Sequence, residues 1–197
     1  MGDEIGCQFA KYSYFNCKLN REVIKLLPGE FYVSDNDVVM ETVLGSCVAA
    51  CVYDPSQGIG GMNHFLLPAP PIQDREKDRS SARYGEYAMD ILIKEVIRMG
   101  AIRSNLEVKL FGGGNVQRNM TEMNIGEKNA NFALDYVKRK EIHLSGYDLV
   151  DIYPRKIIFY PKDGLVMVKK LRVEPTSIIN EEKQYESILQ CKTENNS

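Results

Sequence analysis

The sequence predicts an α+β protein, built as a layered sandwich of two β-sheets with helices packed on one side. Three observations support this fold class. Short apolar stretches bounded by Gly, Pro or Asp turn signals have the length and composition of β-strands. Two longer stretches carry apolar residues at helical spacing. Hydrophobic residues make up 44% of the 197 residues, which is enough for a sizeable core.

The first half of the chain is expected to form closely spaced strands. Turn signals such as Gly45-Ser46 and Asp54-Pro55 separate them, and the last is rich in glycine. The segment that follows, residues 68–80, holds three prolines and six charged residues, so we expect a surface loop there. The expected strands are 30–34, 38–44, 47–53 and 58–68.

Two amphipathic helices are expected in the second half. The first begins near Tyr84 and stops at Gly100, with Ser80 or Ser81 as its cap. The second spans about 125–140, and Asn124 and Glu127 have the spacing of a capping box.

Three further strands are expected around these helices. The first, 106–111, runs into the glycine triplet Gly112–Gly114. The other two, 151–160 and 165–171, flank Lys162-Asp163-Gly164, which is typical of a hairpin turn.

Composition indicates one globular domain with two flanking segments. We expect an N-terminal extension at 1–27, the domain at 28–172 and a polar C-terminal tail at 173–197. The net charge of -2 gives no electrostatic reason to expect nucleic acid as a partner, and no apolar run is long enough for membrane insertion. Five cysteines at irregular spacing, with no secretory signal pattern, suggest a reduced, cytoplasmic protein.

The stretch "VLGSCVAACVYD" (43–54) raises the question of what Cys47 does. A metal site with Cys51 and His64 is disfavoured if this stretch is a strand. The two thiols would then lie about 13 Å apart, at about 3.3 Å per residue, and metal–sulfur bonds measure about 2.3 Å. A phosphate loop at "FGGGN" is also disfavoured, because it lacks the Gly-Lys-Ser/Thr of a P-loop. We expect no metal and no organic cofactor.

A nucleophilic role for Cys47 has the required parts nearby in the sequence. A thiol needs a base to become a thiolate near neutral pH, and His64 follows "GGMN". The glycines of this motif allow another backbone or a substrate to approach closely. A backbone turn at Gly45-Ser46 could direct N–H groups at a developing oxyanion. The parts match acyl transfer by cysteine, although the residues alone leave an inert buried thiol open.

The motifs taken together resemble the CheD family of bacterial chemoreceptor glutamine deamidases. The resemblance runs in order from about residue 27 to 172. It is carried by "LPGEFYVS", "VLGSCVAACVYDP", "GIGGMNHFLLP", "RYGEYAM", "LFGGGN", "NIGEKNANFALDYV" and "GLVMVKKL". One departure is "YDLVDIYPRK", where Val150, Asp151 and Pro154 stand at positions that tend to be glycine in the family.

The resemblance implies roles for single residues. Cys47 matches the family's nucleophile and His64 its base. A threonine that orients the base matches Thr42, with Glu41 as the alternative register. Because successive strand residues face opposite sides, Thr42 and Glu41 cannot both point at His64.

Four further residues are weaker candidates for the site. We expect Gly45 and Ser46 to supply backbone donors for the oxyanion, and Asn63 and Gly113 to lie at the cleft.

The implied function is deamidation of receptor glutamines to glutamate through a Cys–His thioester mechanism. The substrates would be methyl-accepting chemotaxis receptors, and a CheC-type phosphatase would be a docking partner. The alternative is a non-catalytic adaptor that binds the receptors or the phosphatase.

Overall fold

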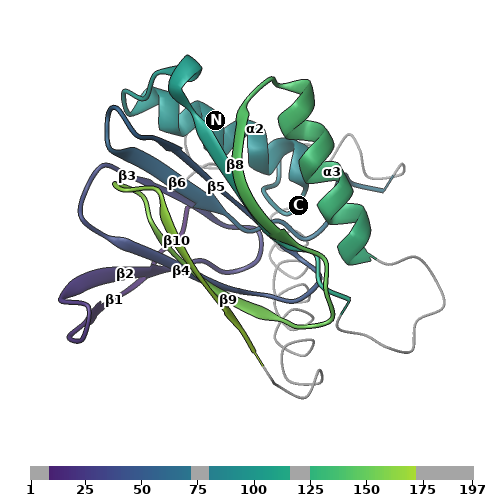
Figure 1. Cartoon of the computed structure of the whole chain (residues 1–197), viewed down its shortest axis with the longest axis horizontal. Coiled ribbons are helices and arrows are strands. Elements are labelled where there is room, and N and C mark those ends of the chain that lie inside the picture. Colours follow the sequence, from purple (N-terminus) through teal and green to yellow (C-terminus); the bar gives the residue numbers. More distant parts are fainter. Residues whose placement is uncertain (1–8, 72–79, 116–124, 172–197) are drawn as a thin grey trace, which may run out of the picture.

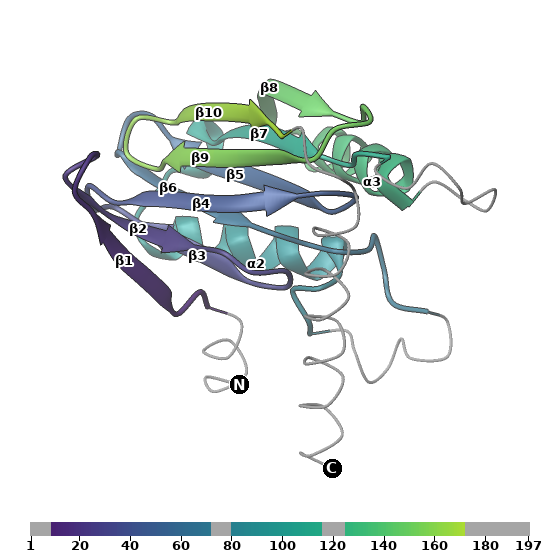
Figure 2. The same cartoon turned by 90° about the horizontal axis from the view of Figure 1, so that it is seen from below.

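The structure, a computed structural model, describes residues 9–71, 80–115 and 125–171. Within this part of the chain, ten strands form two five-stranded sheets, and two helices cover one of them (Figure 1). The layer order is therefore sheet, sheet, helices, which is also visible in Figure 2. This arrangement confirms the predicted α+β sandwich with helices on one side.

The sheet next to the helices, called the inner sheet here, has the order β3-β6-β5-β7-β8. Its first four strands pair antiparallel, whereas β7 and β8 are parallel. β5 is buried along its whole length, because it lies at the centre of the sheet between the two other layers. The strands are β3 (Phe31–Ser34), β5 (Val48–Asp54), β6 (Ile59–Asn63), β7 (Glu107–Gly112) and β8 (His143–Leu149).

The second sheet, called the outer sheet here, has the order β1-β2-β4-β9-β10. β2 and β4 are parallel and the other neighbours are antiparallel. The β9–β10 hairpin turns at the predicted Lys162–Gly164. The strands are β1 (Tyr12–Asn16), β2 (Arg21–Lys25), β4 (Val39–Leu44), β9 (Arg155–Tyr160) and β10 (Leu165–Lys170).

Two hydrophobic cores lie on opposite faces of the inner sheet. The helix-side core packs α2 (Gly85–Arg98) and α3 (Ile125–Arg139) against Val48, Ala50 and Val52 of β5. The inter-sheet core packs the intervening Ala49 and Cys51, and Cys47 just before the strand, against residues of the outer sheet. The alternation of a strand therefore directs odd-numbered residues of this stretch between the sheets.

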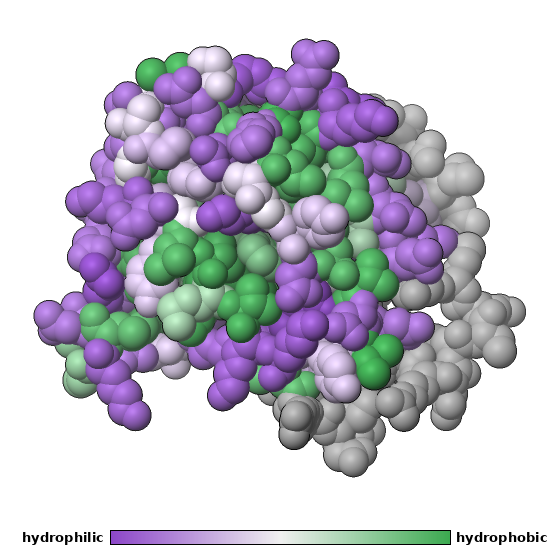
Figure 3. Space-filling view, viewed as in Figure 1, coloured by the Kyte–Doolittle hydropathy of each residue, from purple (hydrophilic) through white to green (hydrophobic). Residues whose placement is uncertain are grey.

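The two edge strands β8 and β10 lie on the same side of the molecule, which faces the viewer in Figure 1. Figure 3 shows apolar side chains gathered among polar ones on this side. The exposed apolar residues of these two strands are Tyr147, Leu165, Met167 and Val168.

Four sequence predictions need correction. The segment 1–27 is not wholly an extension outside the fold, because β1 and β2 belong to the outer sheet. β6 ends at Asn63 and does not continue to Pro68, and β9 begins at Arg155 and not at residue 151. Tyr84 is the N-cap of α2 and makes no side-chain capping bond, and Ser81 Oγ accepts the N–H of Arg83 instead.

Some predictions lie outside the described residues. These are the capping box at Asn124, most of the loop at 68–80 and the tail from 173 onward. Among the described helices, none is both long and apolar enough to cross a membrane.

Candidate active site

Cys47 lies at the turn that leads from β4 of the outer sheet to β5 of the inner sheet. Its side chain belongs to the inter-sheet core and is 3% exposed. Cys51, four residues on, is fully buried in the same core, and burial raises the pKa of its thiol far above the ordinary value. Cys51 is therefore an uncharged core residue at neutral pH.

His64 lies just beyond the end of β6 and faces the same layer. The ladder between β5 and β6 continues past both strands, because Val48 and Phe65 exchange two backbone hydrogen bonds of 3.1 and 3.0 Å. Val48 and Phe65 point to the helix-side core. Their neighbours Cys47 and His64 therefore point to the opposite face, as diagonal neighbours on adjacent strands.

Thr42 of β4 reaches His64 from the outer sheet. Its Oγ1 lies 2.8 Å from His64 Nδ1 and 2.9 Å from the carbonyl oxygen of Leu26. A carbonyl only accepts, so the single hydroxyl hydrogen of Thr42 is donated to Leu26. The hydroxyl oxygen then accepts a hydrogen from Nδ1, and Nε2 is the bare nitrogen.

The imidazole of His64 is uncharged at neutral pH. The side chain is 1% exposed, and burial lowers its pKa to about 3. Nε2 is buried and has no hydrogen-bond partner among the described residues. A neutral ring with a bare Nε2 is the form that can accept a proton.

Glu41 points away from His64, to the outer face of β4. Its carboxylate accepts from Tyr14 Oη at 3.1 Å and pairs with Lys156 Nζ at 2.6 Å. Of the two registers that the sequence left open, the structure thus brings Thr42 to the imidazole.

The segment at Gly29 and Glu30, directly before and at the start of the expected strand 30–34, fixes the backbone of His64. The N–H of His64 donates to Glu30 O at 2.9 Å, and its carbonyl accepts from Gly29 N–H at 2.7 Å. The side chain of Glu30 in turn accepts from Leu27 N–H at 2.9 Å. The signal in the sequence was the "LPGE" motif, which lies directly before the expected strand at 30–34.

The glycine triplet binds the backbone of the Cys47 turn through two hydrogen bonds. Gly113 N–H donates to Cys47 O, and Gly114 N–H donates to Gly45 O, both at 2.8 Å. Gly113 has φ +64°, and a Cβ there would lie 2.6 Å from Gly126 O of α3. A Cβ on Gly112 would collide with Cys47 O. Only glycine allows these three segments to approach so closely.

Of the weaker candidates, Asn63 lies elsewhere than expected. Asn63 is fully buried on the helix side, where Nδ2 donates to Ala88 O and Oδ1 accepts from Ala50 N–H, both at 2.9 Å. It therefore holds α2 on the inner sheet and does not line a cleft beside His64. Gly113 lies beside Cys47 and donates to its carbonyl, and Ser46 is half-buried with its carbonyl bound by Asn129.

Asn129 of α3 is the residue at this site that the sequence analysis did not identify. It is fully buried, and Nδ2 donates to Ser46 O at 3.0 Å and to Leu66 O at 2.8 Å. The only signal for it was its place in "NIGEKNANF" within the second helix.

Comparison with known proteins shows the family of this chain. A family model described as CheD chemotactic sensory transduction matches residues 66–170. The probable chemoreceptor glutamine deamidase CheD of Methylobacillus flagellatus is 49% identical over 187 residues, covering 94% of this chain and 92% of that protein. The chain belongs to the CheD family.

Other relatives and one solved structure extend the comparison. A probable chemoreceptor glutamine deamidase CheD 1 of Shewanella oneidensis is 47% identical, over 87% of this chain and 84% of that protein. The crystal structure of the Bacillus licheniformis hypothetical protein YfiH matches 62% of this chain and 51% of that chain, at 10% identity and a TM-score of 0.40. The match to the CheD family model begins after Cys47 and His64, whereas the CheD relatives cover nearly the whole chain.

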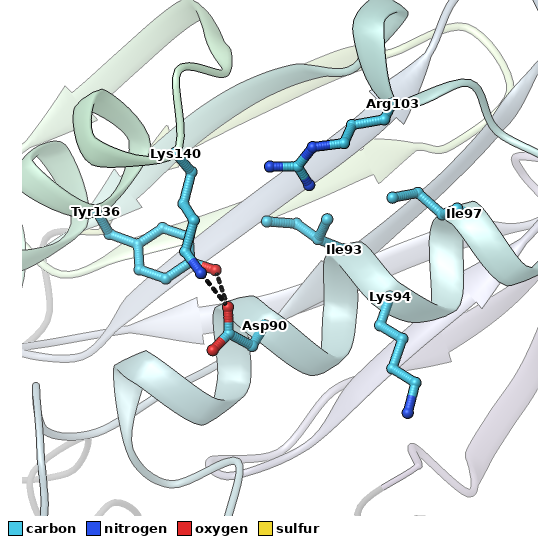
Figure 4. A pocket seen from close by; sticks show the side chains of 7 residues that line it. All are labelled: Asp90, Ile93, Lys94, Ile97, Arg103, Tyr136 and Lys140. Atoms are coloured by element: carbon cyan, nitrogen blue, oxygen red, sulfur yellow. Dashed lines mark hydrogen bonds and ion pairs between the residues drawn. The ribbon is translucent and has the colours of Figure 1, made fainter.

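A separate pocket of this CheD protein lies between α2 and α3, on the far side of the inner sheet. Its volume is 280 Å³, and Figure 4 shows Tyr136 of α3 and Lys140, one residue past α3, converging on Asp90 of α2. Tyr136 Oη donates to Asp90 at 2.5 Å, and Lys140 Nζ donates at 2.9 Å. These two hydrogen bonds join the α3 segment to α2.

The described part of the CheD chain shows no cluster of metal-binding side chains. No group of three or more His, Cys, Asp and Glu side chains there is arranged to hold a metal ion.

Proposed function

We propose that this protein is a glutamine deamidase that converts glutamines of methyl-accepting chemotaxis receptors to glutamate, with Cys47 as nucleophile and His64 as base. The observation that carries the proposal is the Thr42–His64 contact of 2.8 Å between Oγ1 and Nδ1. It fixes a neutral imidazole with a bare Nε2 in the layer that the Cys47 side chain also faces. The names of the relatives, which are chemoreceptor glutamine deamidases, supply the substrate class.

The reaction is proposed to run through a thioester. His64 Nε2 takes the proton of Cys47, and the thiolate sulfur attacks the carboxamide carbon of the glutamine. The protonated imidazole then gives its proton to the departing ammonia. A water molecule, deprotonated by the same nitrogen, hydrolyses the thioester to glutamate and restores the thiol.

The tetrahedral intermediate needs hydrogen-bond donors for its oxyanion. We propose the backbone N–H groups of the Gly45–Cys47 turn, including that of Cys47 itself. The turn is well held for this purpose, since the Gly45 and Cys47 carbonyls both accept from the glycine triplet at 2.8 Å.

A substrate can reach the Cys47 thiol only after a conformational change. Cys47 is 3% exposed, so the residues around it must part before a glutamine carboxamide can reach the sulfur. The same burial favours the alternative function, an adaptor that binds receptors or a CheC-type phosphatase without turnover. By the family resemblance the receptor substrates are cytoplasmic helices, and we therefore propose a cytoplasmic location.

A single assay separates the enzyme from the adaptor. The protein and Cys47→Ala are incubated with receptor cytoplasmic fragments, and mass spectrometry follows the 1 Da gain of glutamine converted to glutamate. We expect conversion by the wild type only. Conversion by both proteins would refute Cys47 as nucleophile, and binding without conversion by either would favour the adaptor.

The CheC-type phosphatase is proposed as a second partner, on the resemblance alone. Titration of the protein with such a phosphatase, followed by calorimetry, should give a saturable signal that receptor fragments reduce if both bind near Cys47. Absence of a signal would remove this partner.

A further inference from the structure

Three successive carbonyl oxygens at the Cys47 turn are all bound by donors from neighbouring segments. The glycine triplet binds Gly45 O and Cys47 O through backbone N–H groups. Ser46 O lies between them and is bound by the side chain of Asn129, at 3.0 Å from Nδ2. The middle peptide of the turn, which joins Ser46 to Cys47, is thus held by one side chain of α3.

The Asn129 amide has an unambiguous orientation. Its nitrogen lies against two carbonyl oxygens, Ser46 O and Leu66 O, which can only accept. The register of Val48 and Phe65 sets Leu66 opposite Cys47. One amide nitrogen therefore ties together the strand that carries the thiol and the strand that carries the imidazole.

The binding of Ser46 O also orients a donor at the reaction centre. In a trans peptide, the C=O of one residue and the N–H of the next point in opposite directions. The described residues contain no cis peptide. Because Asn129 binds the carbonyl of Ser46, the N–H of Cys47 points away from α3, and rotation of this peptide would break the bond to Asn129.

We propose that Asn129 is a positioning residue for deamidation, which acts by fixing the Ser46–Cys47 peptide and the facing Leu66 peptide. It does not touch the substrate. This inference rests on the proposed function, and it concerns the transition state, in which the thiolate and the oxyanion donors must be aligned. Asn129 Oδ1 is buried and has no hydrogen-bond partner among the described residues. The hydrogen bonds of the side chain are therefore those that Nδ2 donates to the two carbonyls.

The proposal predicts that loss of the Asn129 amide lowers kcat and leaves KM nearly unchanged. Asn129→Ala leaves both carbonyls without this donor and allows the Cys47 peptide to rotate. Misplacement of reacting groups by about 1 Å can reduce rates about 100-fold. We therefore expect kcat for receptor glutamines to fall about 100-fold, with KM within about threefold of the wild type.

Tyr136→Phe is the matched control. Tyr136 is also fully buried on α3, two turns further along, and its hydroxyl binds Asp90 of α2, not the Cys47 turn. The substitution removes one buried hydrogen bond from the same helix. We expect a lower melting temperature and unchanged kcat at a temperature where each variant is folded.

Asn129→Asp supplies a second test with a readout that a purely structural role does not produce. A carboxylate there would repel both carbonyls, whereas the protonated acid can donate to one of them. Burial favours the protonated form of a carboxyl group as the pH falls. We expect kcat of Asn129→Asp to rise about tenfold relative to the wild type as the pH is lowered from 8 to 5.5.

The outcomes are distinct. The proposal stands if three results are obtained together. The kcat of Asn129→Ala is lower than that of the wild type, and the kcat of Tyr136→Phe equals it. The kcat of Asn129→Asp rises relative to the wild type on acidification. It is overturned if Asn129→Ala and Tyr136→Phe both retain kcat. If Asn129→Ala does not fold, a pH profile of Asn129→Asp parallel to that of the wild type overturns it. Equal rates for the wild type and Cys47→Ala would instead show that the proposed function has failed, and the inference with it.

Discussion

The two nitrogen atoms of His64 lie in different surroundings, and this difference decides what the ring can do. Nδ1 is bound by Thr42, and Nε2 has no partner among the described residues. The sequence pattern identified Cys47 and His64 as candidates, but it could not choose between Thr42 and Glu41. That choice depends on which face of β4 meets the inner sheet, and strand pairing sets this, not the local sequence.

Replacement of Thr42 should separate orientation of the base from stability. Thr42→Val keeps the shape but removes the acceptor of the Nδ1 hydrogen, so the ring is free to rotate or change tautomer. A lost hydrogen bond of this kind is worth about 1.4 kcal/mol, so we expect kcat to fall about tenfold or more. Thr42→Ser should recover most of it. Equal kcat values for the Val and Ser variants would contradict the orienting role.

The burial of His64 should appear in the pH dependence of stability. The folded protein keeps the ring neutral down to about pH 3, whereas the unfolded chain takes up a proton below about pH 6.5. Between these values the unfolded state binds more protons, so stability falls as the pH falls, by about 1.4 kcal/mol per pH unit.

The comparison of the wild type with His64→Asn isolates this contribution from that of the carboxylates. Urea denaturation between pH 6.5 and 4.5 should give a steeper loss of unfolding free energy for the wild type. Parallel curves would show that His64 is not held neutral by burial.

At the scale of single elements, the loop between β8 and β9 combines strain with strong anchoring. Val150 and Asp151 have φ of 66° and 77°, a region that is costly for a β-branched residue. The buried guanidinium of Arg155 holds this loop through Asp148 and through the carbonyls of Asp148 and Val150. The anchors therefore keep Val150 in a conformation that suits glycine.

Val150→Gly should stabilise the protein. The left-handed conformation costs a non-glycine residue about 1–3 kcal/mol, and the greater entropy of glycine in the unfolded chain offsets about 0.5–1 kcal/mol of this gain. We expect a net increase of about 1 kcal/mol in the free energy of unfolding, measured with urea. Asp151→Gly is the control: it should give a smaller gain, because Asp tolerates the left-handed region better than a β-branched residue and because the change removes the 2.7 Å ion pair with Lys170. A loss of stability in Val150→Gly would contradict the strain.

The sequence predicted the elements with continuous or periodic apolar patterns well, together with the exposed hairpin strand β10, and it missed β1, β2 and β8. β4, β5, β7 and both helices have continuous or periodic apolar patterns, and they appear within one or two residues of the expected ranges. β1 and β8 were missed because their residues are mostly exposed or half-buried, so burial leaves little apolar signal in them. The support of the Cys47 turn by Asn129 was missed for another reason. It depends on a contact between residues 83 positions apart in the chain.

On the scale of the whole molecule, the site exists only where the two sheets meet. Thr42 comes from the outer sheet, and Cys47 and His64 come from the inner one. The distance between the sheets therefore controls the alignment of the base, and the inter-sheet core sets that distance.

Two methionines allow this dependence to be tested. Met40 lies in the inter-sheet core and Met89 in the helix-side core, and both are fully buried. Met40→Ala and Met89→Ala should each lower the free energy of unfolding by about 2–4 kcal/mol. Only Met40→Ala is expected to reduce kcat of the folded protein, measured well below the melting temperature. Equal effects on kcat would show that the spacing of the sheets does not matter.

The carbonyl of Leu26, one residue past the β2 strand, determines which nitrogen of His64 carries the hydrogen and which can accept a proton. It takes the only hydrogen that Thr42 can give, and so obliges the ring to present its lone pair on the side away from Thr42. A shortened protein that starts at residue 28 would lack this acceptor. Thr42 could then donate to the imidazole, and the ring would carry its hydrogen on the wrong nitrogen for catalysis.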